Sequence, residues 1–569
     1  MTAPRDPLAR SRRRLRLLAL FFLLAYAAVG VRLGHLLLRD GGDPEGGDEA
    51  RKPVEVPARA DIVDRRGRLL ATDIPMAGFA LDPLFVHDPE ATARLLAAEL
   101  DGVDAADLAR PLSRPGRRFA WVKRELLPEE QRRVLELGLP GTILRYGRRR
   151  VWPQGDLAGH LLGTTGVDHI GLAGVEYAYD SRLRDLPDVP LRLSLDLAVQ
   201  QVLREELEAA FRRFRARGAC GLVLDLRDGG VLALSSLPAL DPLHYGESAP
   251  EVRLNRCTGA VYELGSMFKL VSVAAALESG RVSLYDRFDV SGPLRIGRHR
   301  ISDVHRNDRP FTVPEIIAHS SNIGTAQMVF AAGGAPVLRE MLHRLGFDAP
   351  PAWPLPERDA PLFPQRWPEV VVATVSFGHG IAVSPLQFAT GVAALVGDGH
   401  LRRPRLLADE PVDATPHPVV SERTVRDLRW LMWLVVERGT GTKAASPVYL
   451  VGGKTGTADK PAVGRRGYDR TRTISSFVGV FPIEDPRYLV LTVLDEPHGD
   501  AGTFGFRYGG WTAAPVVGAV IERLGPLLGV PPSTEEARRA LESRLLVERL
   551  VDPDTGRRET RLAAVRADR

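Results

Sequence analysis

Five strand-like runs, two before and three after a long helical block, constrain the fold of this chain more than any other feature. The first two, Gly218 to Leu226 and Gly230 to Ser236, are joined through Arg227-Asp228-Gly229, which predicts a hairpin. The other three are Val448 to Val451, Ser475 to Phe481 and Tyr488 to Leu494. Strands at both ends of a domain with helices between them predict one antiparallel sheet sandwiched by helices, an α+β fold.

The residues around these runs set the expected limits of this domain to 191–530. Leu191 to Asp196 is predicted to be a short strand, and a helix with apolar positions at helical spacing follows it. Ala513 to Leu524 is expected to be the closing helix. Residues 531–569 form a charged, peripheral tail, with one amphipathic helix expected from Thr534 to Leu550.

The N-terminal segment predicts a membrane anchor. Residues 1–16 are a basic tail, and residues 17–38 are largely apolar. About 22 helical residues, each rising roughly 1.5 Å, would cross a hydrocarbon core. Because the arginines precede the apolar run, we expect the tail in the cytoplasm and the rest of the chain outside. A cleaved signal peptide ending near Ala25-Tyr26-Ala27 is the alternative, and residues 39–53, rich in Gly, Asp and Glu, are expected to be a linker.

The stretch from 54 to 190 predicts an irregular α/β accessory domain. Short strand-like and helical pieces alternate there with turn signals such as Asp64 to Gly67 and Pro153 to Gly155. A chain of 569 residues exceeds the size at which one hydrophobic core stops growing, so two or more domains are expected. No internal repeat is evident.

Charge and cysteine content exclude several classes of function. The net charge of +5 is small for this length and is concentrated before the first apolar run, so nucleic acid is not an expected partner. Cys220 and Cys257 are the two cysteines, and the sequence has neither a CxxC nor an HExxH pattern, so no metal site or cofactor is predicted. We interpret the two cysteines as buried free thiols, with a single bridge between them as the alternative.

The tetrapeptide Ser266-Met267-Phe268-Lys269 opens a strongly helical stretch, Phe268 to Leu277. A spacing of three places the hydroxyl and the amine on one helix face, within hydrogen-bond reach. A serine is a poor nucleophile unless a base takes its proton, and a desolvated lysine can serve as that base. On its own the pattern is weak, because an N-cap serine with a solvated lysine has the same sequence.

Two further polar motifs follow. Ser320-Ser321-Asn322 comes after an apolar helical stretch, where a serine could relay a proton and an asparagine could hold a peptide carbonyl, although a plain turn has the same composition. Gly453-Lys454-Thr455-Gly456-Thr457 ends a predicted strand. A phosphate-binding loop would need glycine where Val448 stands, so the nucleotide interpretation fails. A strand edge with Lys454 and two threonines instead suits an extended peptide and its terminal carboxylate.

The ordered triplet S-x-x-K, S-x-N, K-T-G resembles penicillin-binding proteins and serine β-lactamases. The accessory region adds a likeness to class B penicillin-binding proteins, because Arg59 to Gly67 is similar to their first pedestal motif and Gly171 to Glu176 to their second. Ala60 and Trp152 depart from the usual pattern of that pedestal. The resemblance implies a pedestal of the dimerisation type at 54–190 and a transpeptidase domain at 191–530.

Two stretches are most similar to the cell-division subgroup, the penicillin-binding protein 3 or FtsI type. They are Val261 to Ser266, in which Leu264 stands where the elongation enzyme usually has proline, and Gly378 to Gln387. The resemblance therefore implies cross-linking of cell-wall peptides during septum formation. An elongation-type class B enzyme, a hydrolytic D,D-carboxypeptidase or β-lactamase, and a sensor that binds β-lactams or muropeptides without turnover are the alternatives.

The resemblance also implies a role for each motif residue. Ser266 would attack the penultimate carbonyl of a D-Ala-D-Ala stem peptide, with Lys269 as general base. Ser320 and Lys454 would form a proton path to the leaving amine, although which lysine is the base at each step stays open. The remaining implied roles are in binding: Asn322 for the acyl-chain amide, Thr455, Gly456 and Thr457 for the peptide and its carboxylate, and the backbone N–H groups of Ser266 and Thr457 for the oxyanion.

The implied partners follow from the same resemblance. They are peptidoglycan stem peptides as donor and amine acceptor, β-lactams as covalent inhibitors, the membrane, a SEDS-family (FtsW-like) glycosyltransferase and other divisome proteins. The implied location is the bacterial cytoplasmic membrane, with a single span and the catalytic domain on the periplasmic side. His379 lies on a glycine-rich loop, where we expect a structural role.

Overall fold

The computed structural model describes residues 58–547 except 167, 413–415, 463, 465 and 466, together with residues 23, 24, 26, 27, 29 and 30. Those six N-terminal residues are helical and exposed. Within the described part, no helix combines the length and the hydropathy that a membrane crossing requires. The predicted basic tail, the linker, most of the predicted anchor at 17–38 and residues 548–569 lie outside the described residues.

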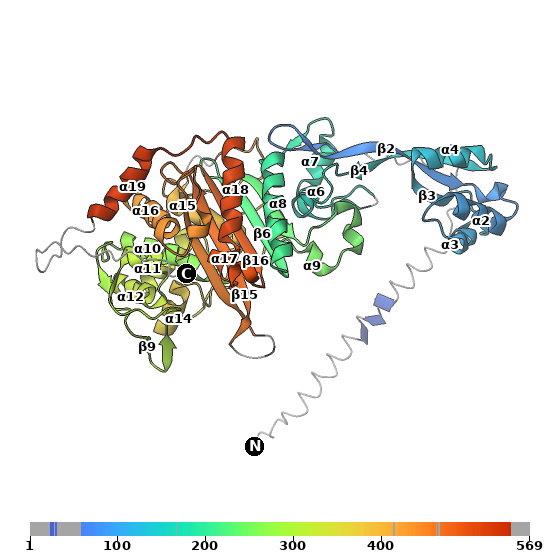
Figure 1. Cartoon of the computed structure of the whole chain (residues 1–569). Coiled ribbons are helices and arrows are strands. Elements are labelled where there is room, and N and C mark those ends of the chain that lie inside the picture. The colour runs from blue at the N-terminus through green and yellow to red at the C-terminus, as the bar shows by residue number, and fades with distance from the viewer. Residues whose placement is uncertain are drawn as a thin grey trace, which may run out of the picture. The chain divides into compact units, whose positions relative to one another are not determined.

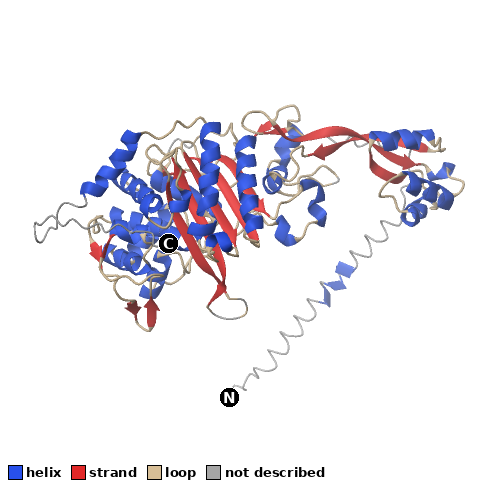
Figure 2. Ribbon diagram, in the orientation of Figure 1, coloured by secondary structure: helices blue, strands red, loops and turns tan. Residues whose placement is uncertain are grey.

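A five-stranded antiparallel sheet forms the centre of the larger domain, as the sequence predicts (Figures 1 and 2). Its strand order is β14-β15-β16-β6-β7, so β14 is a terminal strand. The bounds are Gly218–Asp225 for β6, Val231–Leu237 for β7, Gly452–Pro461 for β14, Tyr468–Phe481 for β15 and Tyr488–Asp495 for β16.

The predicted strand at Val448 to Val451 is wrong, because β14 begins only at Gly452. The run is apolar because Tyr449, Leu450 and Val451 are buried in the core. Its backbone bonds to other segments: the Leu450 amide donates to the Ser533 hydroxyl at 2.8 Å, and the Leu450 carbonyl accepts from Ile483 at 2.9 Å. Lys454 consequently lies within the strand rather than after it.

Helices cover both faces of the sheet. On one face, α8 (Leu197–Arg213) and α18 (Ala514–Leu527) lie side by side in Figure 1, and their apolar side chains share a core cluster with Phe477 and Phe481 of β15. On the other face, α10, α15 and α16 share a core with Val478 and Val480. This alternation along β15 follows from the two-residue period of a strand. The bounds are Lys269–Glu278 for α10, Pro385–Val396 for α15 and Glu422–Arg438 for α16.

The other elements of this domain are short. The 3-10 turn η3 spans Gly265–Phe268 and precedes α10. The remaining helices around the site are Val313–Ala318 (α11), Asn322–Ala332 (α12), Ala335–Arg344 (α13), Glu369–Ser376 (α14) and Gly509–Thr512 (α17). The predicted strand at Leu191 to Asp196 is regular only over Leu191–Arg192 (β5).

The accessory region contains two packing units rather than one. The unit called here the head consists of β3 (Ala120–Leu126), α2 (Pro89–Glu99), α3 (Ala105–Leu112), α4 (Pro128–Glu136) and the adjoining parts of β2 (Leu69–Leu81) and β4 (Thr142–Val151). It has its own apolar core around Phe79, Leu96 and Leu108.

The second unit, called here the base, contains β1 (Ile62–Val63) and the short helices α5 to α7, which are Gly159–Leu162, Gly174–Ala178 and Asp180–Asp185. Strand β1 pairs with β2 on one side and, in parallel, with β5 on the other. Its apolar residues, among them Ile62, Leu161 and Val175, belong to the core that continues into the sheet domain. The base is therefore part of the larger domain in packing terms.

Buried ion pairs hold the base together. Glu176 accepts hydrogen bonds from Arg59 Nε at 3.0 Å and from Arg150 Nε at 2.6 Å. Arg59 also bonds to Asp180 at 2.6 Å, and Arg150 to Asp73 at 3.2 Å. Arg59 and Glu176 come from the two pedestal motifs, so the structure joins those motifs through one shared carboxylate.

The interpretation of Cys220 and Cys257 as free thiols is wrong, because the two form a disulfide. Cys220 lies in β6, and Cys257 lies in the segment between Arg253 and η3. Their Cα atoms are 5.4 Å apart, a normal distance for a bridge, although 37 residues separate them in sequence. The spacing of the two cysteines carries no signal for this bridge, because the contact forms only in the tertiary structure.

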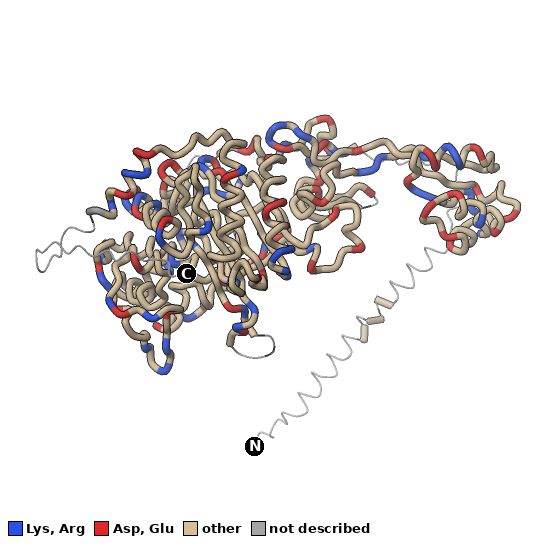
Figure 3. Tube along the Cα trace, viewed as in Figure 1, with Lys and Arg blue, Asp and Glu red and all other residues tan. Residues whose placement is uncertain are grey.

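The predicted C-terminal helix is present as Glu535–Val547 (α19). It packs on α16: the indole of Trp430 donates to the Leu541 carbonyl at 3.2 Å, and Leu545 is buried. Basic and acidic residues are both spread along the described chain in Figure 3. Arg523 of α18, for example, bonds to Glu205 and Glu206 of α8 at 2.6 and 2.7 Å.

Candidate active site

The nucleophile candidate Ser266 lies in the 3-10 turn that leads directly into α10. Its neighbours Met267 and Phe268 are buried, and the Phe268 ring packs against Phe388 with centroids 5.2 Å apart. Ser266 itself is only partly buried. The apolar neighbours fix the turn, while Ser266 stays partly accessible.

Glycines bring the serine turn and β14 into backbone contact. Gly265 has a φ of +53°, and a Cβ there would lie 2.3 Å from the Thr457 carbonyl oxygen. A Cβ on Gly456 would lie 2.4 Å from the carbonyl oxygen of Leu264. Both distances are too short for any side chain, so these positions require glycine. The first and third motifs, 188 residues apart between Ser266 and Lys454, therefore meet.

The Ser320 hydroxyl joins the two lysines. It accepts from Lys269 Nζ at 3.0 Å and from Lys454 Nζ at 3.1 Å, and Lys269 also donates to the Ser320 carbonyl. Ser320 has a φ of +57°, a left-handed conformation that costs free energy in a serine and is held by the surrounding structure. Among the described residues, the Ser266 hydroxyl makes no side-chain hydrogen bond, and Lys269 donates to Ser320.

Both lysines are fully buried, and their pKa values are lowered. Burial and then the charge of Lys454 hold the pKa of Lys269 well below its ordinary value. Burial lowers the pKa of Lys454 to about 7. A low-dielectric site disfavours the ammonium form, and two ammonium groups facing one hydroxyl repel each other. Lysine can therefore accept a proton in this site near neutral pH.

Asn322 is the first residue of α12, and an aspartate that the sequence reasoning missed fixes it there. Asp303 accepts from the backbone amides of Asn322 at 2.6 Å and Ile323 at 3.0 Å, and from the Ser321 hydroxyl at 2.6 Å. A carboxylate at a helix N-terminus is favourable because it satisfies free amides and faces the positive end of the dipole. Asp303 lies 19 residues before Asn322, too far for a local capping signal.

The third motif lies on the terminal strand β14, as a peptide-docking edge requires. Thr455 is buried, and its hydroxyl bonds to that of Thr440 at 2.7 Å. Thr457 is partly exposed, and its hydroxyl accepts from the amide of Gly509 at 3.0 Å. Thr440 and Gly509 are two further neighbours of the motif that the sequence alone did not single out.

The family is shown by comparison with known proteins. The chain matches the family "Penicillin binding protein transpeptidase domain" over residues 219–522, and "Penicillin-binding Protein dimerisation domain" over residues 54–186. The chain belongs to the class B penicillin-binding proteins.

The relatives of this penicillin-binding protein agree with that assignment. It is 38% identical over 538 residues to the probable peptidoglycan D,D-transpeptidase FtsI of Caulobacter vibrioides, covering 92% of this chain and 90% of the relative. It is 31% identical over 552 residues to the peptidoglycan D,D-transpeptidase FtsI of Escherichia coli, covering 91% of each chain.

A solved structure supports the fold. Penicillin binding protein 3 of Mycobacterium tuberculosis in its apo form has a TM-score of 0.66 at 24% identity, covering 84% of this chain and 98% of the other. A structure of the same protein with aztreonam has been solved, with a TM-score of 0.66 at 23% identity and the same two coverages. The fold of this penicillin-binding protein is therefore shared with proteins of that type.

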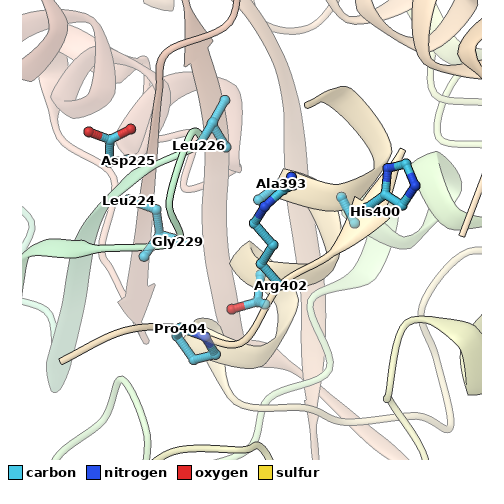
Figure 4. A pocket seen from close by; sticks show the side chains of 10 residues that line it. Leu224, Asp225, Leu226, Gly229, Ala393, His400, Arg402 and Pro404 are labelled. Carbon is cyan, nitrogen blue, oxygen red and sulfur yellow. The ribbon is translucent and has the colours of Figure 1, made fainter. Parts of the chain in front are cut away.

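A separate depression in this penicillin-binding protein contains none of the motif residues (Figure 4). It lies between the turn that joins β6 to β7, helix α15 and β12 (His400–Leu401), and its lining includes Asp225 and Arg402. Its volume of about 20 Å³ holds little more than one water molecule. Burial raises the pKa of Asp225, but the cavity has no room for a peptide substrate.

Proposed function

We propose that this protein is a peptidoglycan D,D-transpeptidase that works through an acyl-enzyme on Ser266. The observation that carries the proposal is that two buried lysines from different motifs both donate to the Ser320 hydroxyl beside the turn that carries Ser266. A nucleophile, proton-accepting amines and a relay hydroxyl are the groups that serine acyl transfer needs. The family membership agrees with this chemistry.

In the acylation step, Ser266 Oγ attacks the penultimate carbonyl of a stem peptide that ends in D-Ala-D-Ala. Lys269 in its neutral form takes the hydroxyl proton, and the bond to the terminal D-alanine breaks. The leaving nitrogen receives a proton through Ser320 from the lysine pair. The backbone N–H groups of Ser266 and Thr457 hold the oxyanion, a contribution of about 3 to 4 kcal/mol for each donor.

The donor peptide binds along the edge of β14. A terminal strand offers backbone hydrogen bonds to an extended peptide, and the absence of a side chain at Gly456 allows close approach. The hydroxyls of Thr455 and Thr457 bind the terminal carboxylate, and the amide of Asn322 holds the acyl chain. β-Lactams acylate Ser266 in place of the peptide, which the aztreonam complex of the Mycobacterium tuberculosis relative supports.

The relatives named FtsI support a role in septal cell-wall synthesis. In this proposal residues 17–38 anchor the protein in the cytoplasmic membrane, residues 54–190 form the pedestal and residues 191–530 the transpeptidase domain on the periplasmic side. The partners are a SEDS-family glycosyltransferase and other divisome proteins. A fluorescent fusion that lines the side wall and does not gather at the septum would contradict the septal role.

Labelling with a fluorescent penicillin tests the catalytic proposal. The wild-type protein is expected to form a covalent adduct that survives denaturation, and Ser266→Ala is expected to form none, because the nucleophilic oxygen is gone. Ser272→Ala is the matched control: Ser272 is buried in α10 and bonds to the Ser376 carbonyl at 2.6 Å, so it tests helix disturbance without touching the site. Normal labelling of Ser266→Ala would reject the assignment.

A further inference from the structure

Glu263, three residues before Ser266, holds two other segments against the serine turn. Its Oε1 accepts from the Gly380 amide at 3.0 Å and from the Tyr468 hydroxyl at 3.1 Å. Its second oxygen, Oε2, is buried and has no hydrogen-bond partner among the described residues. Burial raises the pKa of this carboxyl. One carboxyl group thus connects the first motif to the loop at 378–380 and to the start of β15.

The loop at 378–380 and Tyr468 contact each other and the serine turn. We call residues 378–380 and Tyr468 the tyrosine wall. Gly378 has a φ of +83°, and a Cβ there would lie 2.1 Å from the Gly265 carbonyl oxygen. The His379 ring meets the Tyr468 ring edge-on, with centroids 5.5 Å apart. Tyr468 in turn pairs with Pro461 at the far end of β14.

The loop of the tyrosine wall lies against the serine turn, where Gly378 contacts the backbone of Gly265. Burial first, and then the positive charge of Lys269 among smaller effects, lower the pKa of His379. Apart from Ser266 itself, the donor contacts proposed above lie on β14 and at Asn322, so none of them uses the wall. A transpeptidase must also hold a second substrate, whose amine attacks the acyl group on Ser266.

Tyr468 has the chemistry to hold that amine. Its hydroxyl donates to Glu263, and although the Gly380 amide also interacts with its oxygen, a phenol oxygen has a further lone pair that can accept a hydrogen bond from an N–H group. Hydrogen bonding to a carboxylate polarises the phenol and strengthens it as an acceptor. Tyr468 is 42% exposed, so a ligand can reach it, whereas Oε2 of Glu263 is buried.

We propose that Tyr468 binds the acceptor amine of the second stem peptide and that Glu263 is a positioning residue that orients and polarises Tyr468. The inference rests on the proposed transpeptidase function. In the transfer step the amine nitrogen bonds to the acyl carbon, the ester bond to Ser266 breaks, and the proton lost by the amine returns to Ser266 Oγ through Lys269. Tyr468 holds the amine during this exchange and is not consumed.

The experiment separates acylation from transfer in the purified full-length protein. A fluorescent penicillin reports acylation, and a synthetic thioester donor with increasing concentrations of a D-amino acid reports the partition between aminolysis and hydrolysis. Tyr468→Phe keeps the ring contact with His379 and removes the hydroxyl. Glu263→Gln keeps an acceptor oxygen for Gly380 and Tyr468 and removes the charge. Tyr285→Phe, at an exposed tyrosine elsewhere, is the matched control.

Tyr468→Phe is expected to weaken the apparent affinity for the amine about tenfold, and Glu263→Gln about threefold, while penicillin acylation stays within about twofold of wild type. Tyr285→Phe is expected to change neither. An unchanged partition in Tyr468→Phe, or an equal loss of acylation and transfer, overturns the assignment. Failure of the wild-type protein to acylate would instead overturn the proposed function, and this inference with it.

Discussion

Two buried clusters of charge in this protein have opposite compositions. In the base, the guanidinium groups of Arg59 and Arg150 share the carboxylate of Glu176. In the active site, Lys269 and Lys454 share a neutral hydroxyl, and each is deprived of water. The first cluster is compensated, and it joins segments that are distant in sequence. The second is not, so its lysines give up protons readily.

Asp303 is the carboxylate that acts on Lys269, but it does not compensate the charge of the two lysines. Asp303 raises the pKa of Lys269, but burial and the charge of Lys454 outweigh it. Its oxygen atoms are occupied by the amides of Asn322 and Ile323. A buried charged group that has a counter-charge thus stabilises the structure, whereas one that lacks a counter-charge can serve as a proton acceptor.

The largest expected effect comes from Lys269→Met, which removes the charge and keeps the length of the side chain. We expect the rate of acylation by penicillin to fall about 10³-fold, because the proposed general base is lost and Lys454 contacts Ser320 rather than Ser266. The melting temperature should not fall, since an uncompensated buried charge is lost. Calorimetry beside the labelling assay checks both, and a large drop in melting temperature would show that Lys269 is structural.

A substitution in the base should lower stability and leave acylation unchanged, the opposite of Lys269→Met. Glu176→Gln leaves two buried guanidinium groups short of a counter-charge, and we expect a loss of about 3 kcal/mol of unfolding free energy. Acylation by the remaining folded protein should be unchanged. Glu125→Gln is the control: Glu125 pairs with Arg149 at the surface at 3.3 Å, so it should cost less than about 1 kcal/mol. Equal losses in the two variants, measured by denaturant unfolding, would remove the distinction between the clusters.

The smallest expected effect concerns pH. The pKa of Lys454 is about 7 in the folded protein and near its ordinary value of 10.5 when unfolded, so the unfolded chain binds more protons between these values. Wild-type stability should therefore rise relative to Lys454→Met as the pH increases above about 7, by a shift on the order of a few degrees in melting temperature. Calorimetry at pH 6 and pH 9 checks this, and a constant difference would contradict the lowered pKa.

Local patterns predicted the parts of the fold that depend on neighbouring residues. The hairpin of β6 and β7, strands β15 and β16 and helix α10 follow from periodicity and turn residues. The resemblance of the ordered triplet to that of penicillin-binding proteins predicted that the three motifs meet. Their positions agree with that prediction in the structure.

The features that escaped prediction all depend on distant partners. The run at Val448 to Val451 is apolar, as a strand would be, but its backbone bonds to Ser533 and Ile483. Cys257 meets Cys220 only after β6 and the segment before η3 pack together. Asp303 reaches α12 from another part of the chain. The division of the accessory region into head and base depends on which apolar residues share a core, which spacing does not reveal.

The backbone contacts at Gly265, Gly378 and Gly456 limit which substitutions the active site can tolerate during evolution. Any side chain at these positions would overlap a carbonyl oxygen of a neighbouring segment. Substitution of these glycines is therefore disfavoured where the serine turn, the loop at 378–380 and β14 touch. Inherited changes in what the enzyme accepts, including escape from an antibiotic, must arise instead among the side chains around these three glycine contacts.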